Sequence, residues 1–197
     1  MSRDISSSFL FVLADRGGFN FCLPVIHDLR ERGISVMCLL AKILDHNLRA
    51  TENDFGEYIV YDEKIKSLYK LIEQNSFLPQ VAIINSLVTR DLEKNLIYHL
   101  KKINVPIISP IDTWNFFKFR FSPVEKEKLG EELSFLPDFV LVVDSYAKEQ
   151  AIKEGIPEEI IVITGNPHFE NLRLFLGPGK SFLYRESSVF FGTLKID

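Results

Sequence analysis

The sequence predicts an α/β domain built on a doubly wound, mostly parallel, Rossmann-like sheet of about seven strands. Three observations support this fold class. Short apolar runs rich in Val, Ile and Phe alternate with longer amphipathic segments along the chain. Most of these runs are apolar on both faces, as in parallel strands that helices cover from both sides. A chain of 197 residues, 46% of them hydrophobic, suits one compact domain or at most two small ones.

The strands and helices are expected to alternate with right-handed crossovers. The seven expected strands are residues 8–14, 34–40, 58–61, 81–85, 106–110, 139–144 and 160–164. The expected helices are residues 20–32, 64–73, 92–103 and 146–154. We expect Asn20 to cap the first helix, with Pro24 in its first turn and Gly33 at its end. Ser145 is the expected cap of the helix that closes at Gly155.

Charge and composition exclude several classes of protein. The net charge of −4 provides no basic field for a nucleic acid. The longest apolar runs, residues 9–14 and 139–143, are far shorter than the roughly 20 residues that a transmembrane helix needs. The N-terminus lacks the pattern of a secretory signal, and Cys22 and Cys38 are interpreted as reduced, buried thiols. We therefore expect a cytoplasmic protein without a transmembrane segment.

Neither a metal nor a cofactor is expected. His27, His46 and His99 have no clustered partners that would complete a zinc site. The chain contains no phosphate-binding P-loop, nucleophile elbow or CxxC motif, and its glycine pair is not the dinucleotide-binding fingerprint.

Ligands of such sheets bind at the carboxyl ends of the strands, so the residues that follow each strand are the candidate site. After the first strand come Arg16, Gly17, Gly18 and Asn20. The paired glycines allow the backbone to approach a ligand closely, and the following helix directs N–H groups at an anion. A tight turn between strand and helix needs glycine equally, so both interpretations stay open.

The loops after the fourth and fifth strands carry polar candidates. Asn85 and Ser86 are placed to donate hydrogen bonds into the crevice, whereas Asp91 is interpreted as the cap of the helix over residues 92–103. Asp112 is the carboxylate expected nearest the centre of the crevice. It is a candidate catalytic base or ligand of a sugar hydroxyl, and a turn-forming aspartate is the alternative.

Aromatic and polar residues follow the later strands. Trp114 opens a segment in which aromatic rings alternate with two cations, within an expected long loop over residues 111–123. Its rings are suited to stack on a sugar or base, to lie at a membrane–water boundary, or to fold back over the sheet. After the seventh strand come Asn166 and His168, with Pro167 in the first turn of a helix. A polar cap or crevice role is favoured for His168 over catalysis.

Two stretches carry a resemblance to a known group of enzymes. Residues 13–18, LADRGG, run into residues 23–33, LPVIHDLRERG, and residues 137–143, PDFVLVV, precede EGIP and the ITGNPHF turn. In this order they resemble the N-terminal half of GT-B-fold enzymes, which include lipid-A-disaccharide-synthase-like transferases and UDP-N-acetylglucosamine 2-epimerases. The resemblance implies a GT-B N-terminal-type domain over residues 1–175. Residues 176–197 then resemble a linker and the start of an absent second domain, with residues 188–194 as its first strand.

The resemblance implies the acceptor-side half of a sugar-nucleotide-dependent glycosyltransferase that uses a UDP-sugar in polysaccharide biosynthesis. Such a half is not expected to be active alone, and its partners would be a separate C-terminal GT-B domain or a second copy. A sugar or a lipid-linked acceptor, and peripheral association with the inner membrane face, fit the same interpretation. Two alternatives stay open: a non-catalytic binding module or remnant, and a 2-epimerase-like enzyme. The epimerases carry an acidic residue after the fourth strand and His-x-Glu after the fifth, where this chain has Asn85-Ser86 and Ile111-Asp112.

Overall fold

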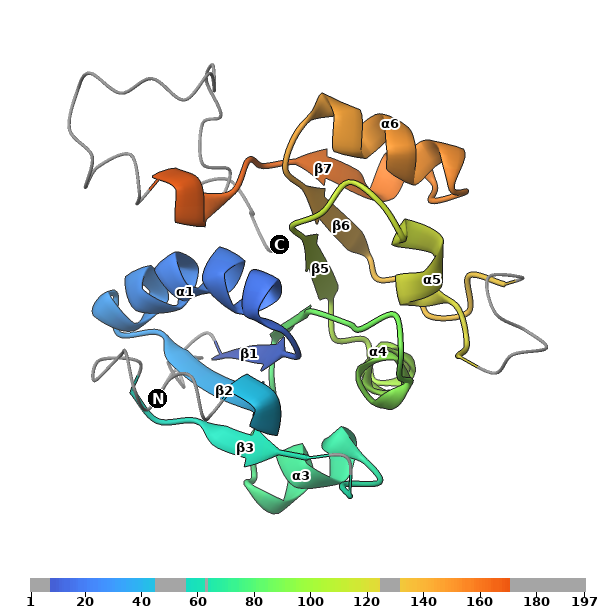
Figure 1. The fold of residues 1–197 in the computed structure, drawn as a ribbon. Coiled ribbons are helices and arrows are strands. Elements are labelled where there is room, and N and C mark those ends of the chain that lie inside the picture. Colours follow the sequence, from blue (N-terminus) through green and yellow to red (C-terminus); the bar gives the residue numbers. More distant parts are fainter. Residues whose placement is uncertain (1–7, 45–55, 63, 125–131, 171–197) are drawn as a thin grey trace.

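The seven strands form one sheet in which every pair of neighbours is parallel. The computed structural model describes residues 8–44, 56–62, 64–124 and 132–170. The strand order is β3-β2-β1-β4-β5-β6-β7 (Figure 1). The strands are β1 (Ser8–Leu13), β2 (Ser35–Ala41), β3 (Ile59–Tyr61), β4 (Val81–Ile84), β5 (Ile107–Ile111), β6 (Phe139–Val142) and β7 (Ile161–Ile163). The predicted fold class and all seven predicted strands are confirmed.

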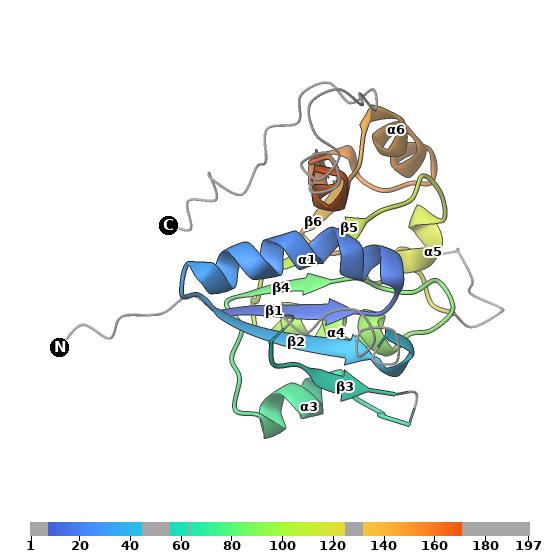
Figure 2. The ribbon, with the colours of Figure 1, turned by 60° about the vertical axis from the view of Figure 1, so that its left-hand side comes forward.

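Helices cover both faces of this sheet. They are α1 (Arg16–Glu31), α3 (Leu68–Gln74), α4 (Leu92–Lys102), α5 (Phe117–Phe121), α6 (Ser145–Lys153) and the short 3₁₀ helix η1 (Glu158–Ile160). In Figures 1 and 2, α1 lies over one face of the sheet, while α3 and α4 lie over the other. Alternate residues of β1 divide accordingly: Phe11 and Leu13 pack with α1, and Leu10 and Val12 pack with α3 and α4. This double burial explains why the strands are apolar on both faces.

Helix α1 begins four residues earlier than the sequence pattern predicts. Asp15, in an extended conformation, caps it by accepting a hydrogen bond from the Gly18 N–H at 2.8 Å. The predictions that Asn20 is the cap and that Pro24 lies in the first turn are therefore wrong, because both residues lie further inside the helix. The predicted stop is confirmed: Gly33 follows the helix with φ of 74°.

Two other predictions need correction. The cap of α6 is Asp144, whose carboxylate accepts from the Ala147 N–H at 2.7 Å, and Ser145 is the first helical residue. The expected loop over residues 111–123 contains α5, whose Phe117 and Phe121 are fully buried in the core. Folding of rings over the sheet is thus confirmed for these two residues. Cys22 and Cys38 are buried free thiols, as expected.

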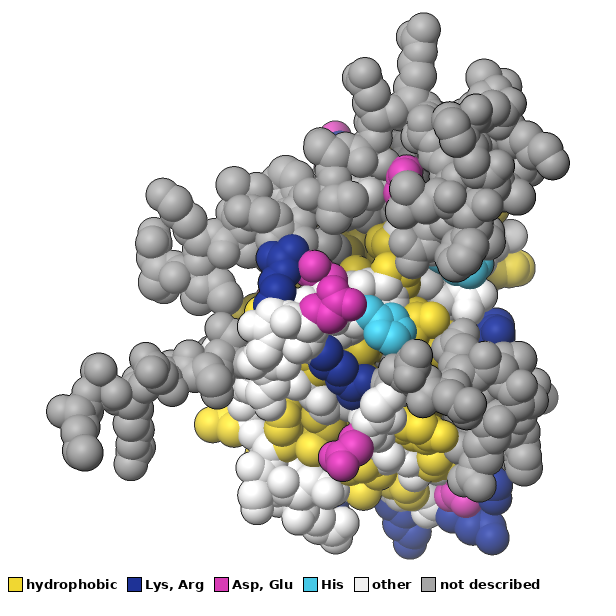
Figure 3. Space-filling view, turned by 90° about the vertical axis from the view of Figure 1, so that its left-hand side faces the viewer, with side chains coloured by type: hydrophobic (Ala, Val, Ile, Leu, Met, Phe, Trp, Pro, Cys, Tyr) yellow, Lys and Arg dark blue, Asp and Glu magenta, His cyan; other side chains and the backbone are white. Residues whose placement is uncertain are grey.

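The surface combines charges of both signs. Figure 3 presents one face, on which acidic, basic and hydrophobic side chains are interspersed. Among the described helices, none combines the length and apolarity that crossing a bilayer requires. The predicted tail over residues 176–197, including its expected strand over residues 188–194, and His46 lie outside the described residues.

Candidate functional site

The strand order reverses between β1 and β4. From β1 the strands are added toward one edge of the sheet, through β2 to β3, and from β4 they are added toward the other edge, through β5 and β6 to β7. Helix α1, which follows β1, covers one face, and α4, which follows β4, covers the other. The loops after these strands therefore separate, and this divergence is where ligands bind in open α/β sheets. The structure brings four of the predicted residues together here, because Asp112 and Asn85 lie against Gly17 and Gly18 respectively.

The side chain of Asn85 fills the space between the ends of β1 and β4. It is fully buried, and its Oδ1 accepts hydrogen bonds from the backbone N–H groups of Ala14 at 3.1 Å and Asp15 at 3.2 Å. Its Nδ2 is a buried donor without a hydrogen-bond partner among the described residues. Asn85 therefore holds the β1–α1 connection in place and keeps its amide NH₂ group unused.

Ser86, also predicted to face the crevice, is hydrogen-bonded to Arg120 within the fold. Its hydroxyl donates to the Arg120 carbonyl at 3.1 Å, and the Arg120 Nη1 donates to the Ser86 carbonyl at 2.9 Å. Both side chains are buried. This reciprocal pair joins α5 to the end of β4, so the Ser86 hydroxyl is already occupied within the fold.

Gly17 and Gly18 are required by side chains that come from neighbouring strands. A Cβ atom at Gly17 would overlap the Asp112 Oδ2, and a Cβ atom at Gly18 would overlap the Asn85 Cγ. Both glycines lie in the first turn of α1, and neither has a positive φ. The need for glycine at these positions is therefore steric: it comes from the side chains of Asp112 and Asn85 and not from a positive φ.

Asp112 lies one residue after β5, is partly buried, and has both a carboxylate, that of Asp15, and a guanidinium, that of Arg120, near it. Burial raises the pKa of its carboxyl group above the ordinary value of 3.8, and the nearby Asp15 carboxylate raises that pKa further. The Arg120 guanidinium acts in the opposite direction. A carboxyl group with a raised pKa holds a proton more readily, which is the property that a general base needs.

Trp114 and Phe116 stand out from the surface beside this group. They are 42% and 52% exposed, unlike Phe117 and Phe121 of the same segment. The Trp114 indole N–H donates to the Asp144 Oδ2 at 2.8 Å, which ties the end of β5 to the start of α6. Phe116 has φ of 62°, a left-handed conformation that costs a bulky residue energy.

The remaining predicted residues lie in α1 and in the segment after β7. Arg16 is exposed, with its guanidinium carbon 5.9 Å from the centroid of the Phe19 ring, and Asn20 is half-buried within α1. After β7, the Asn166 Oδ1 accepts from the His168 N–H at 3.0 Å, and Pro167 begins a helical segment as predicted. This segment turns back from the β7 edge toward α1 in Figures 1 and 2.

Sequence reasoning missed several charged residues that are buried or partly buried. Arg120 was interpreted as one of two cations between aromatic rings, and Asp15 and Asp144 were not selected as site residues, although each lies two residues after the end of a strand. Asp91 occupies the N-cap position of α4, but its carboxylate makes no capping bond: it accepts from the Val124 N–H at 3.1 Å and pairs with Lys94 at 3.3 Å. The predicted cap is therefore corrected to a tie between α4 and the segment after α5.

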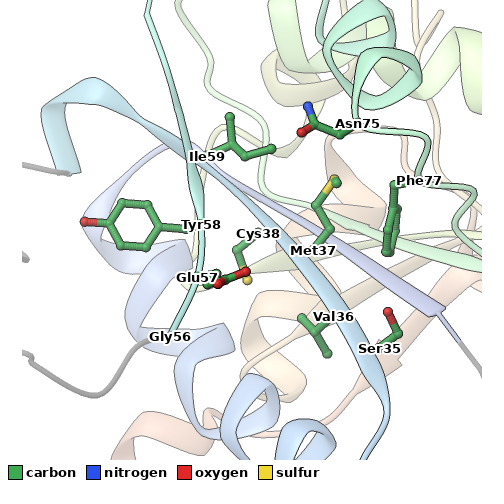
Figure 4. A pocket seen from close by; sticks show the side chains of 10 residues that line it. All are labelled: Ser35, Val36, Met37, Cys38, Gly56, Glu57, Tyr58, Ile59, Asn75 and Phe77. Carbon is green, nitrogen blue, oxygen red and sulfur yellow. The ribbon is translucent and has the colours of Figure 1, made fainter.

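A groove lies elsewhere, at the β2–β3 edge of the sheet. It encloses about 610 Å³ between the first half of β2 and the segment that leads into β3 (Figure 4). Arg30 donates to the Glu57 carbonyl at 2.9 Å beside it. Its lining residues are Ser35, Val36, Met37, Cys38, Gly56, Glu57, Tyr58, Ile59, Asn75 and Phe77. Across residues 8–44, 56–62, 64–124 and 132–170, no three His, Cys, Asp or Glu side chains converge as a metal site would require.

Comparison with known proteins identifies relatives in structure only. No protein-family model and no curated protein matches the chain. A UDP-N-acetylglucosamine 2-epimerase from Rickettsia bellii is 13% identical, with a TM-score of 0.56, over 85% of this chain and 46% of that one. The enzyme from Neisseria meningitidis, solved with UDP-GlcNAc bound, is 16% identical, with a TM-score of 0.55, over 86% of this chain and 49% of that one.

The enzyme from Methanocaldococcus jannaschii gives the same result, with 12% identity, a TM-score of 0.52, and coverage of 82% of this chain and 46% of that one. The chain thus spans about half the length of the solved structures that it matches. Its sheet of seven parallel strands, covered by helices on both faces, has a GT-B-like fold, as the matched half of these structures does.

Proposed function

We propose that the chain is the acceptor-side half of a sugar-nucleotide-dependent glycosyltransferase, completed by a second GT-B-type half or by a second copy. The single observation that carries the proposal is the position of Asp112 at the carboxyl end of β5, against the first turn of α1. Its burial and the neighbouring Asp15 raise its pKa. In this role Asp112 accepts the proton of the attacking acceptor hydroxyl, while the nucleoside diphosphate leaves from the sugar.

Transfer is favoured over epimerisation because of the residue at the end of β4. The epimerase-like interpretation needs an acidic side chain there, and this chain has Asn85, whose Oδ1 is engaged by two backbone N–H groups. An amide in this position accepts no proton. Deprotonation at a sugar carbon therefore lacks the second acid–base group that it requires.

The other residues receive supporting roles in the same proposal. Arg16, Asn20, Asn166 and His168 line the approach to the strand ends, and Trp114 contacts the acceptor. A sugar or a lipid-linked sugar is the acceptor class that fits a carboxylate beside an exposed aromatic ring.

The chain alone is not expected to turn over substrate. Micromolar binding of a nucleotide sugar needs about 8 kcal/mol, and one helix N-terminus contributes about 0.3–1 kcal/mol toward a phosphate. Here the Asp15 carboxylate already accepts from the Gly18 N–H of that terminus. A second half is needed to bind the nucleotide and to exclude water from the reacting carbon.

The test is a transfer assay with UDP-N-acetylglucosamine and a panel of glycoside acceptors, performed with the chain alone and with a separately expressed C-terminal GT-B half. We expect no product from the chain alone and product from the mixture. The Asp112→Asn variant should lose at least about 100-fold in the mixture, as removal of a general base does. Absence of product from every mixture would remove the transferase proposal and leave the binding module.

A further inference from the structure

One exposed aromatic residue follows the candidate base closely along the chain. Trp114 is 42% exposed, is the only tryptophan of the chain, and follows Asp112 by two residues. Its neighbour Phe116 is 52% exposed on a left-handed backbone. The rings of Phe117 and Phe121, one and five residues beyond Phe116, are fully buried. Two aromatic rings of this segment are therefore buried in the core, and the two exposed rings lie nearer the end of β5.

The Trp114 ring is held in place by a carboxylate from another strand. Asp144 follows β6, and its two oxygens act on different groups: Oδ2 accepts from the indole N–H at 2.8 Å, and Oδ1 accepts from the Ala147 N–H at 2.7 Å. One side chain thus caps α6 and fixes the indole. A pre-oriented ring loses little conformational entropy when a ligand packs on it, which favours binding.

The carboxylates of Asp112 and Asp15 favour an uncharged ligand over a phosphate. Asp15 follows β1 and Asp112 follows β5, on either side of β4, so two carboxylates lie at this edge of the sheet, with Asp112 in contact with the first turn of α1. Carboxylates accept hydrogen bonds from hydroxyl groups and repel phosphates. The flat indole suits the apolar C–H face of a sugar ring. A carbohydrate without charge matches both features, whereas a nucleotide matches only the ring.

Resting on the proposed function, we propose that Trp114, held by Asp144, is the platform on which an uncharged pyranose ring of the acceptor stacks while one of its hydroxyls donates to Asp112. Asp144 is a positioning residue in this arrangement, since it acts through the indole. The phosphates of the donor bind elsewhere, on the second half of the enzyme.

The single tryptophan makes the proposal measurable in the full chain. We would titrate the protein with the methyl β-glycosides of glucose, galactose and N-acetylglucosamine, and separately with UDP and inorganic phosphate, while recording Trp114 emission. The expected result is a saturable change with at least one glycoside and none with phosphate. Saturation by UDP or phosphate without any glycoside response, or no saturable response at all, would overturn the proposal.

Variants of Asp144 separate positioning from folding. Asp144→Ser keeps a hydroxyl that caps α6 but is too short for the indole, and Asp144→Asn offers one acceptor oxygen in place of two. Both should lower the anisotropy of Trp114 emission and weaken glycoside binding about fivefold, with the thermal midpoint within a few degrees of the wild type. Unchanged anisotropy and affinity in both variants would contradict the role of Asp144.

A double-mutant cycle by calorimetry tests whether the two residues act together. Trp114→Phe keeps a ring and removes the N–H, so adding Asp144→Ser to it should cause no further loss of affinity. The matched control is Tyr98→Ala, which removes a half-exposed ring from α4, away from the strand ends, and should leave binding unchanged. Full additivity of the two substitutions would oppose the proposal.

The two proposals fail in different ways. If a glycoside binds and responds to the Asp144 variants, but no mixture with a second half gives product, the platform stands and the transferase proposal fails. If Asp112→Asn abolishes transfer in an active mixture while the Asp144 variants leave glycoside affinity unchanged, the transferase stands and the platform fails.

Discussion

Two groups of buried or partly buried polar and charged side chains follow the strands of this sheet, and they differ in how their polar atoms are satisfied. One group, here called the α4 cluster, consists of Tyr61, Arg90, Asp91, Glu93 and Lys94. The other, here called the crevice group, consists of Asp15, Asn85, Asp112 and Arg120. Both lie where strands give way to loops or helices.

In the α4 cluster each charge faces an opposite one. Glu93 is fully buried, accepts from the Tyr61 hydroxyl at 2.7 Å and pairs with Arg90 at 2.5 Å. Lys94 is also fully buried, donates to the Ser122 carbonyl at 2.7 Å and pairs with Asp91 at 3.3 Å. Such pairing is what a purely structural cluster needs, because a buried charge without a partner is costly.

The crevice group is arranged in the opposite way. Burial and then the like charge of Asp15 raise the pKa of Asp112, and the opposite charge of Arg120 only partly offsets them. The Asn85 Nδ2 and the Arg120 Nε are buried donors without partners in the described part of the chain. Unused polar capacity lowers stability and persists where it serves a function. The comparison therefore supports a structural role for the α4 cluster and the proposed functional role for the crevice group.

The largest expected effect is a loss of stability on substitution in the α4 cluster, and it tests the structural role of that cluster. Glu93→Ala leaves the Tyr61 hydroxyl and the Arg90 guanidinium without their shared acceptor in the interior. Breaking one member of a buried pair costs about 3–5 kcal/mol, so the free energy of unfolding in urea should fall by about that amount. The control is Asp28→Ala, which removes an exposed i,i+4 pair with Arg32 and should cost at most about 0.5 kcal/mol.

An equal and small effect for both substitutions would contradict the structural role of the α4 cluster. The reverse ranking, with Asp28→Ala the more harmful, would contradict the burial on which the comparison depends. Glycoside binding by the Glu93→Ala protein, measured where it is still folded, should match the wild type.

The next largest expected effect is the loss of stability when a glycine of α1 is replaced by alanine. In an exposed helix Gly→Ala stabilises by about 1 kcal/mol, but here each new Cβ meets a side chain from another strand. Gly18→Ala meets Asn85, which two backbone N–H groups hold in place. It should destabilise by about 1–3 kcal/mol, as overpacking does. Thermal and urea unfolding measure this change.

Gly17→Ala should cost less than Gly18→Ala, because the Asp112 carboxylate that it meets is the end of a side chain that can rotate. Its main effect should be displacement of that carboxylate and weaker glycoside binding. Stabilisation by either substitution would show that the contacts with Asp112 and Asn85 are absent.

The fold was predictable from sequence because it depends on local periodicity. All seven strands are apolar runs, and runs buried on both faces are visible in the sequence itself. The start of α1 was not predictable in the same way. Gly17 and Gly18 suggest a turn, and only contacts with residues about 70 and 95 positions away explain two glycines inside a helix.

The candidate site was predictable in position but not in its details. Asp112 and Asn85 follow strands, and the rule that ligands bind at strand ends was sufficient to select them. Arg120 was interpreted as one of two cations between aromatic rings, and its burial depends on the reciprocal bonds with Ser86. Glu93 and Lys94 have the spacing of an ordinary solvated helix face, so their burial follows only from packing against β3 and the segment after α5.

The smallest effect tests the charge of the crevice group through pH. The pKa of Asp112 is raised in the folded protein, so above its ordinary value of 3.8 the folded state binds more protons than the unfolded state. The free energy of unfolding that this group contributes therefore falls as the pH rises through that window.

Asn does not titrate. The stability of Asp112→Asn relative to the wild type should consequently increase from about pH 4 upward and level off once the wild-type carboxyl is ionised. Urea unfolding across this range measures the difference, and Asp28→Asn, at an exposed position, corrects for the change in net charge. A relative stability that falls with pH would mean that Arg120 outweighs burial and Asp15, and that Asp112 is a paired structural carboxylate like those of the α4 cluster.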